Sequence, residues 1–187
     1  MTTAGPSLRL SKIDAARRQL VTAVRLYFCD EDPVAIHTLV SAAHAVLSDL
    51  NHAAAGHPTL KDVIARQVRP DQAKEVRRQL NAAANFFKHA NTDPKATFEL
   101  LTSQTEVFTL DACLKYRELS GELVPVLGVY ETWFWLGPGA QFVDVTTGQA
   151  IERFRVAFKG ASRSSYFHAA LTIGRAAQKL DQSPLEK

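Results

Sequence analysis

Helix start signals recur along the chain, and apolar residues at helical spacing follow each of them. Ser11-Lys12-Ile13-Asp14 and Thr59-Leu60-Lys61-Asp62 have the form of a capping box, in which the first and last residues satisfy each other's free backbone N–H groups. Asp32-Pro33 and Asp93-Pro94 place a carboxylate before a proline, which favours the first turn of a helix. Together with the apolar spacing, these signals predict helices over residues 12–29, 33–50, 60–68, 72–90, 94–120 (either continuous or broken at 102–105), 126–136, 150–158 and 164–180.

This pattern leaves no room for a sheet. Residues 141–148 contain β-forming side chains, but no second strand is available to pair with them. A chain of 187 residues that is 46% hydrophobic suits one globular domain with a sizeable core. We therefore expect an all-α fold, a single-domain helical bundle of six to eight helices over residues 11–180, with a disordered tail at 1–10 and a frayed tail at 181–187.

The helix expected from Gln72 to Ala90 is two-sided, and we place it at the centre of the bundle. One face is apolar and must be buried against other helices. The other face is polar, and on it Asn85 and His89 lie about one turn apart, close enough to share a ligand. Arg78 lies on the same side but roughly 16 Å further back along the helix axis, so it cannot join the same small site from this helix. The polar residues of this face are Arg78, Asn81, Asn85 and His89.

Charge and cysteine usage limit the compartment and the partners. The net charge of +3 allows an acidic partner without requiring one. Cys29 and Cys113 both fall in helical apolar patterns, which predicts two free, buried thiols in a reducing compartment, and hence a cytoplasmic protein. Residues 123–143 hold a single charge, Glu131, but prolines and glycines interrupt them, so we expect a buried core helix there and no membrane span.

The familiar signatures of metal and cofactor chemistry are missing. The chain has no glycine-rich phosphate loop, no nucleophile elbow and no dinucleotide fingerprint. His37 and His44 share a helix flank, but a spacing of seven residues separates their backbones by roughly 10.5 Å, too far to ligate one zinc ion. We expect histidines satisfied by hydrogen bonds, no metal site and no cofactor.

The run Asn85-Phe86-Phe87-Lys88-His89 resembles the helical HEPN superfamily of small bacterial nucleases and their inactive relatives. Members of that superfamily have an arginine, a polar residue and a histidine on a helix, paired across a dimer so that two histidines face RNA. The resemblance implies that Asn85 is the polar residue and His89 the histidine, whereas position 84, where the arginine would stand, is alanine. The run, and that from Asp32 to His37, also resemble segments of uncharacterised small bacterial proteins, which implies no function.

Two functions follow as expectations. The first is a non-catalytic helical binding or scaffold protein. The second is a HEPN-like, metal-independent ribonuclease with His89 and Asn85 as catalytic residues, because such an enzyme needs a general acid or base near neutral pKa. Binding would involve Arg78, Lys88 and Asn81. We expect a homodimer whose partner is RNA or another protein, with no membrane association.

Overall fold

The described part of the chain is entirely helical in its regular elements. The computed structural model describes residues 5, 7–89, 93–137, 152, 156, 158 and 160–181. Its helices are α1 (Lys12–Phe28), α2 (Pro33–Ala53), α3 (Leu60–Arg66), α4 (Ala73–Leu80), α5 (Ala82–Lys88), α6 (Thr102–Ser120), α7 (Pro125–Leu136) and α9 (Arg163–Asp181). The prediction of an all-α bundle of six to eight helices is therefore confirmed.

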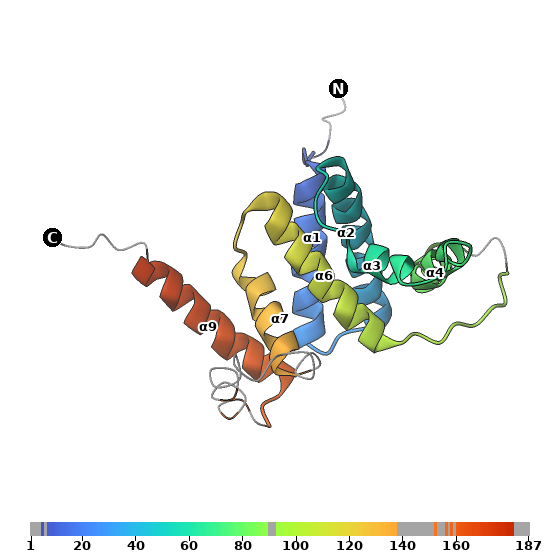
Figure 1. Ribbon diagram of the computed structural model, residues 1–187. Coiled ribbons are helices and arrows are strands. Elements are labelled where there is room, and N and C mark those ends of the chain that lie inside the picture. The colour runs from blue at the N-terminus through green and yellow to red at the C-terminus, as the bar shows by residue number, and fades with distance from the viewer. Residues whose placement is uncertain are drawn as a thin grey trace.

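The core lies between α1, α2, α6 and α7 (Figure 1). α1 and α2 lie side by side and α6 packs across them, so that large side chains from all three interdigitate with those of α7. Burial of each such side chain stabilises the fold by roughly 1.5–3 kcal/mol. Among the largest fully buried apolar residues are Leu20, Val24, Phe28, Val40, Leu47, Phe108 and Tyr130.

Several predicted helix boundaries are confirmed by their caps. The Ser11 hydroxyl accepts from the Asp14 N–H at 3.1 Å, and the Asp32 carboxylate accepts from the Val34 N–H at 2.6 Å. The box of Thr59 and Asp62 is also formed. α6 ends at Gly121, whose φ of 67° is a left-handed conformation that glycine adopts without steric cost.

The helix expected over residues 72–90 is wrong in two respects. It is divided into α4 and α5 at Asn81, and α4 has no buried residue, so this region lies at the edge of the bundle and not at its centre. Val76, Leu80 and Phe87 are only half-buried. The division has a local cause: the Asn81 side-chain amide donates to the Arg77 carbonyl at 2.9 Å, an alternative to the helical hydrogen-bond pattern.

The helix expected to begin at Pro94 is also wrong. The Asp93 carboxylate accepts from the Lys95 N–H at 3.1 Å, but the chain then continues without regular structure to Leu101, and α6 begins at Thr102. A capping residue fixes only the first turn, and a helix needs a buried face to continue. Residues 93–99 are all exposed, which explains why no helix forms there.

Three other expectations have mixed outcomes. Cys113 is buried as predicted, but Cys29 is exposed because it caps α1 beyond the buried face of that helix.

The segments 141–148 and 150–158 lie outside the described residues, apart from isolated positions. α2 is long and apolar enough to cross a membrane by length and composition alone, yet it packs between α1 and α6 as the core helix of a bundle does.

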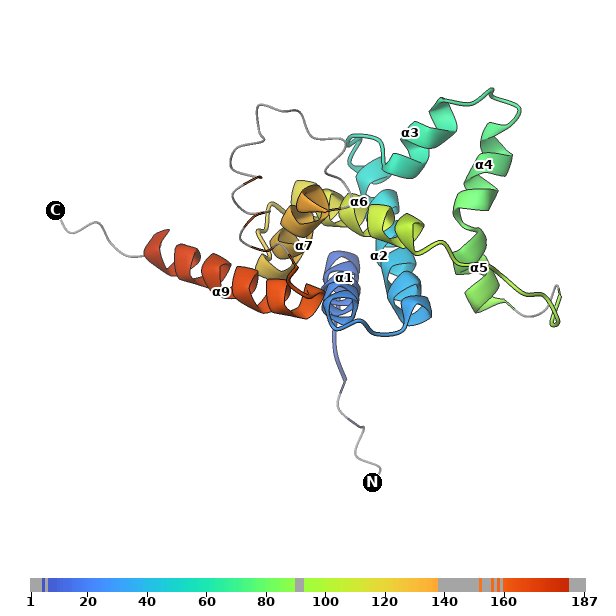
Figure 2. The same cartoon turned by 90° about the horizontal axis from the view of Figure 1, so that it is seen from below.

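Two parts of the molecule extend from the core on opposite sides. α9 extends from α7 and the end of α1, while α3, α4 and α5 form a projection beside α2 and α6 (Figures 1 and 2). We call residues 57–89, which contain these three helices, the arch. Its two ends rest on the bundle, and the main contacts of α4 are with α3 and α5.

We expect Gly56→Ala to destabilise the fold. A Cβ at Gly56 would lie 2.2 Å from Oδ1 of Asn51. Asn51 is fully buried, and its Nδ2 donates to the His57 carbonyl at 2.6 Å. Such overpacking costs about 1–3 kcal/mol in the free energy of unfolding, measurable by urea denaturation. Gly128→Ala is the matched control: its Cβ meets nothing within 4 Å, and alanine within α7 should stabilise the fold by roughly 0.5–1 kcal/mol. Equal effects at both positions would contradict the packing at Asn51.

Candidate functional site

The arch is anchored at its first end by Asp111 of α6. One oxygen of this carboxylate accepts from Nε2 of His44 at 2.7 Å and from the backbone N–H of Leu60 at 3.1 Å. These contacts join α2, α3 and α6 at one point. Leu60 is the first residue of α3, where the backbone N–H groups have no partner within the helix, so a carboxylate there is favourable.

A line of polar groups continues beneath the arch from this anchor. Nδ1 of His37 lies 2.8 Å from the Thr105 hydroxyl, and Nζ of Lys61 donates to Oδ1 of Asn81 at 2.7 Å. We call this set the polar seam: His37, His44, Lys61, Asn81, Thr105 and Asp111. It brings together residues from α2, α3, α6 and the α4–α5 junction.

The seam changes the pKa of its basic groups. Burial, together with the charges of Lys61 and Lys88, lowers the pKa of His37 to about 4. Burial and the charge of Lys88 lower the pKa of Lys61 to about 8, although Asp111 acts in the opposite direction. His37 is therefore neutral at pH 7, and Lys61 loses its proton far more readily than an ordinary lysine.

A second polar cluster holds α4 against α3. Asp62 is buried, which by itself would raise its pKa, but hydrogen bonds from Thr59, Arg77 and His52 hold that pKa well below its usual range. Nη1 of Arg77 donates to it at 2.7 Å and the Thr59 hydroxyl at 2.6 Å. Arg78, one residue further on, is bound instead by both oxygens of Glu75 at 2.7 and 2.6 Å.

The structure separates the predicted site residues into two groups. Asn85, Lys88 and His89 are exposed on α5 and at its end, and their side chains form no hydrogen bond or ion pair with any described residue. The His89 N–H donates to the Asn85 carbonyl at 3.1 Å, which confirms that the two residues are one turn apart. Arg78 on α4 and Asn81 in the seam are engaged elsewhere and do not join them.

Three phenylalanines lie beside this group. Phe86 and Phe98 have ring centroids 5.3 Å apart with an angle of 31° between the planes, and Phe87 lies 5.8 Å from Phe86. Phe86 is 37% exposed and Phe98 38% exposed, which is high for aromatic side chains that touch one another. We call Phe86, Phe87 and Phe98 the phenylalanine cluster. Phe87 also meets the His37 ring at 5.8 Å, so the cluster rests on the polar seam.

Sequence reasoning missed this cluster because it placed Phe98 within a helix expected over residues 94–120. One signal was available: two adjacent phenylalanines on a helix point about 100° apart, so one of Phe86 and Phe87 must turn toward solvent unless the helix is buried all round. The contact with Phe98 could not be inferred, because it depends on the irregular path of residues 93–101.

Comparisons with protein-family models, curated proteins and solved structures give no match. The interpretation of the site therefore rests on its geometry.

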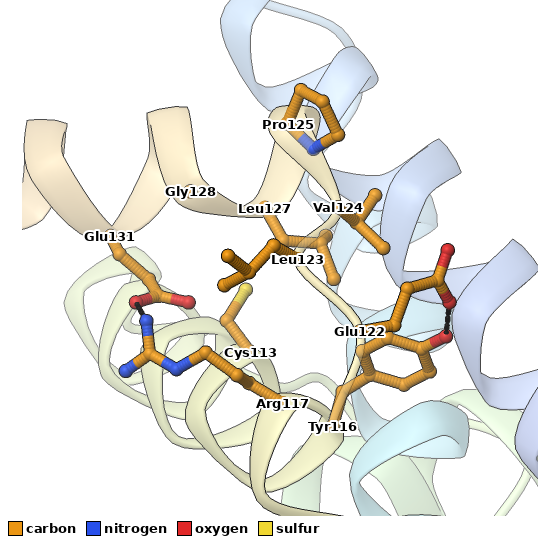
Figure 3. A pocket seen from close by; sticks show the side chains of 10 residues that line it. All are labelled: Cys113, Tyr116, Arg117, Glu122, Leu123, Val124, Pro125, Leu127, Gly128 and Glu131. Carbon is orange, nitrogen blue, oxygen red and sulfur yellow. Dashed lines mark hydrogen bonds and ion pairs between the residues drawn. The ribbon is translucent and has the colours of Figure 1, made fainter. Parts of the chain in front are cut away.

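Two cavities lie outside the arch. One, of about 100 Å³ between α6 and α7, is shown in Figure 3. Cys113 lies at its wall, and burial holds the pKa of this thiol well above its usual value, which makes it a poor nucleophile. At the rim Arg117 donates to Glu131 at 2.6 Å, and Tyr116 donates to Glu122 (Figure 3). This cavity contains none of the predicted site residues.

The second cavity, of about 120 Å³, lies where α1 ends and where α2, α6 and α9 begin. Tyr27 donates to Glu106 at 2.8 Å on its wall, and the Arg163 guanidinium lies 4.5 Å from the Tyr27 ring centroid. Thr105 belongs both to this wall and to the polar seam. Among the described residues no group of three or more histidines, cysteines or carboxylates is placed to hold a metal ion.

We expect His37→Gln to reduce the loss of stability on acidification. Because the pKa of His37 in the folded state, about 4, is below its unfolded value, the unfolded state binds the proton first and stability falls as the pH decreases from about 6.5 to 4. A shift of this size corresponds to about 3 kcal/mol. Glutamine retains a partner for Thr105 without titrating. Urea denaturation at pH 7 and pH 4.5 measures the difference.

His168→Gln is the control for this experiment, since His168 is exposed on α9. It should leave the pH dependence unchanged. If His37→Gln also leaves it unchanged, then His37 is not a buried neutral imidazole in solution.

Proposed function

We propose that the chain is a non-catalytic binding protein that uses the arch and the phenylalanine cluster to bind single-stranded RNA. The observation that supports this most directly is the phenylalanine cluster, in which Phe86 and Phe98 are more than one-third exposed, beside Lys88, which has no ion pair among the described residues. Proteins that bind single strands combine a basic surface for the phosphates with aromatic side chains on which bases stack.

The charge of the chain is concentrated on the arch. Residues 57–89 contain seven lysines and arginines against three aspartates and glutamates, a net charge of +4, whereas the whole chain is +3. The remaining residues therefore sum to −1. Three arch arginines are neutralised by ion pairs, namely Arg69, Arg77 and Arg78. The side chains of Arg66, Lys74 and Lys88 are exposed and have no ion pair among the described residues, so they are available for phosphates.

The phenylalanine cluster supplies a surface of the right kind for bases. Phe86 and Phe98 are each more than one-third exposed, and Asn85, Lys88 and His89 flank them on α5. Stacking of a base on an aromatic side chain contributes ~1–3 kcal/mol. Because every base has a flat face, such a surface binds single strands with little sequence preference and does not bind a duplex whose bases are already stacked.

The absence of catalysis in this proposal rests on Arg78. A ribonuclease of the kind that the sequence resembles needs a cation close to its histidine for the developing charge on phosphorus. Arg78 is bound by Glu75, and both residues lie on α4 and not on α5, at whose end His89 lies. Position 84, where the resemblance would place an arginine, is alanine.

We expect the triple variant Arg66→Gln, Lys74→Gln, Lys88→Gln to bind single-stranded RNA ~10-fold or more weakly than the wild type at low salt, because it neutralises fewer phosphates. Fluorescence anisotropy with a labelled oligonucleotide of mixed sequence measures the Kd. The slope of log K against log salt concentration is negative, and its magnitude should be smaller by ~0.7 for each phosphate that the variant no longer neutralises. Phe98→Ala should weaken binding without changing this slope.

The matched control is Lys12→Gln, Arg18→Gln, Arg25→Gln, which removes the same charge from exposed positions of α1. Leu123→Ala, at an exposed position far along the chain from the arch, is the control for Phe98→Ala. If the two triple variants weaken binding equally, only the net charge matters and the arch is not the binding surface. Equal binding of double-stranded RNA would exclude a role for base stacking.

A second candidate function, a metal-independent ribonuclease, is favoured by one observation. Asn85 and His89 lie one turn apart, exposed, and their side chains have no partner in the described part of the chain. In a homodimer, a second chain could supply the cation that position 84 lacks.

If the chain is a ribonuclease, His89→Ala should abolish RNA cleavage in the presence of a chelator while leaving the RNA Kd within about two-fold, because His89 would act on the proton and not on binding. His52→Ala is the control, since His52 is engaged with Asp62. Absence of cleavage by the wild type, measured by gel electrophoresis of labelled RNA, would exclude this second function and leave the binding proposal intact.

A further inference from the structure

The cavity between α6 and α7 is lined at its depth by buried apolar side chains. Cys113 of α6 is fully buried, and Val124 and Leu127 at the N-terminal end of α7 are buried as well. Leu123 also lines the cavity but is 70% exposed, so the apolar surface continues to the open side. The Cys113 thiol stays protonated at neutral pH, because burial holds its pKa well above its usual value. This wall therefore offers a ligand apolar contact and no charge.

The charged groups at the rim of the cavity are paired with one another. Nη1 of Arg117 donates to Oε2 of Glu131 at 2.6 Å. The Glu122 carboxylate accepts from the Tyr116 hydroxyl and, at 3.1 Å, from Nη2 of Arg17. Figure 3 shows the first pair on one side of the cavity and Tyr116 with Glu122 on the other, with the apolar side chains between them. The charges of these groups cancel, so none is left over to offset the charge of an ionic ligand.

Part of the cavity exists because one residue of α7 has no side chain. Gly128 lies within this helix and lines the cavity, and a Cβ built there would meet nothing within 4 Å. Close packing therefore does not require glycine at this position, and glycine within a helix is less stable than alanine. The chain thus carries a cost in stability that keeps the space beside Gly128 open.

We propose that this cavity binds a small, uncharged, apolar molecule of the size of a benzene ring. An apolar cavity of about 150 Å³ holds benzene. The cavity between α6 and α7, of about 100 Å³, is open on one side, so a ring would fill it and project partly into solvent. Binding is favoured because apolar surface of both the ligand and the wall is removed from water. No residue of the arch lines the cavity, so this inference does not depend on RNA binding.

Titration with benzyl alcohol tests the proposal, with benzoate and benzylamine as charged molecules of similar size. The full chain, with isotope-labelled isoleucine, leucine and valine methyl groups, is followed by NMR. Benzyl alcohol should shift the methyl signals of Leu123, Val124 and Leu127 in a saturable manner, whereas those of Ile36, which lines the second cavity, should not move. Benzoate and benzylamine should bind ~10-fold or more weakly, because their charge would lose water without gaining a partner.

Filling the cavity from α7 itself provides the decisive variant. Gly128→Leu should weaken the binding of benzyl alcohol ~10-fold or more, because a leucine side chain and a ligand cannot occupy the same space. Gly128→Ala fills less of the space and should weaken binding to a smaller extent. Leucine and alanine favour a helix more than glycine does, so both variants should remain folded, which urea denaturation checks. Gly5→Leu, which adds the same side chain in open space outside the cavity, should bind benzyl alcohol as the wild type does.

Three results would overturn the proposal. The first is the absence of saturable binding of benzyl alcohol by the folded wild type. The second is equal binding by the wild type and both variants of Gly128, which would place the ligand elsewhere. The third is a response of Ile36 in place of Leu123 and Leu127. Equal binding of benzyl alcohol, benzoate and benzylamine would overturn the inference that the ligand is uncharged.

Discussion

The position of the arch depends on one carboxylate at the edge of the core. Asp111 accepts hydrogen bonds from His44 of α2 and from the backbone at the start of α3, so that a single side chain of α6 sets the distance between three helices. Removing this carboxylate would leave the buried His44 ring unpaired, which costs more than the hydrogen bond itself contributes. The placement of α3, and through Lys61 and Asn81 that of α5, follows from this junction.

Much of the fold could be predicted because its signals are local. The caps at Ser11, Asp32 and Thr59 and the stop at Gly121 are each decided by a few neighbouring residues, and all four are found. The division at Asn81 could not be predicted in the same way. An asparagine within a helical pattern can project into solvent or bond to the preceding turn, and here a lysine twenty positions earlier holds it in the second arrangement.

The candidate site was predictable where it depends on helical spacing and not where it depends on contacts between distant segments. Asn85 and His89 are neighbours as the spacing requires. The engagement of Arg78 by Glu75 follows an i, i+3 pattern that was present in the sequence. The environment of Lys61 had no local signal, because Phe108, Asp111 and Lys88 approach it from other helices.

Lys88 links the interior of the arch to the surface that we propose for RNA. Its charge contributes to the lowered pKa of Lys61, and its exposed side chain is one of the cations proposed to bind phosphates. A phosphate held at Lys88 would offset that charge and raise the pKa of Lys61.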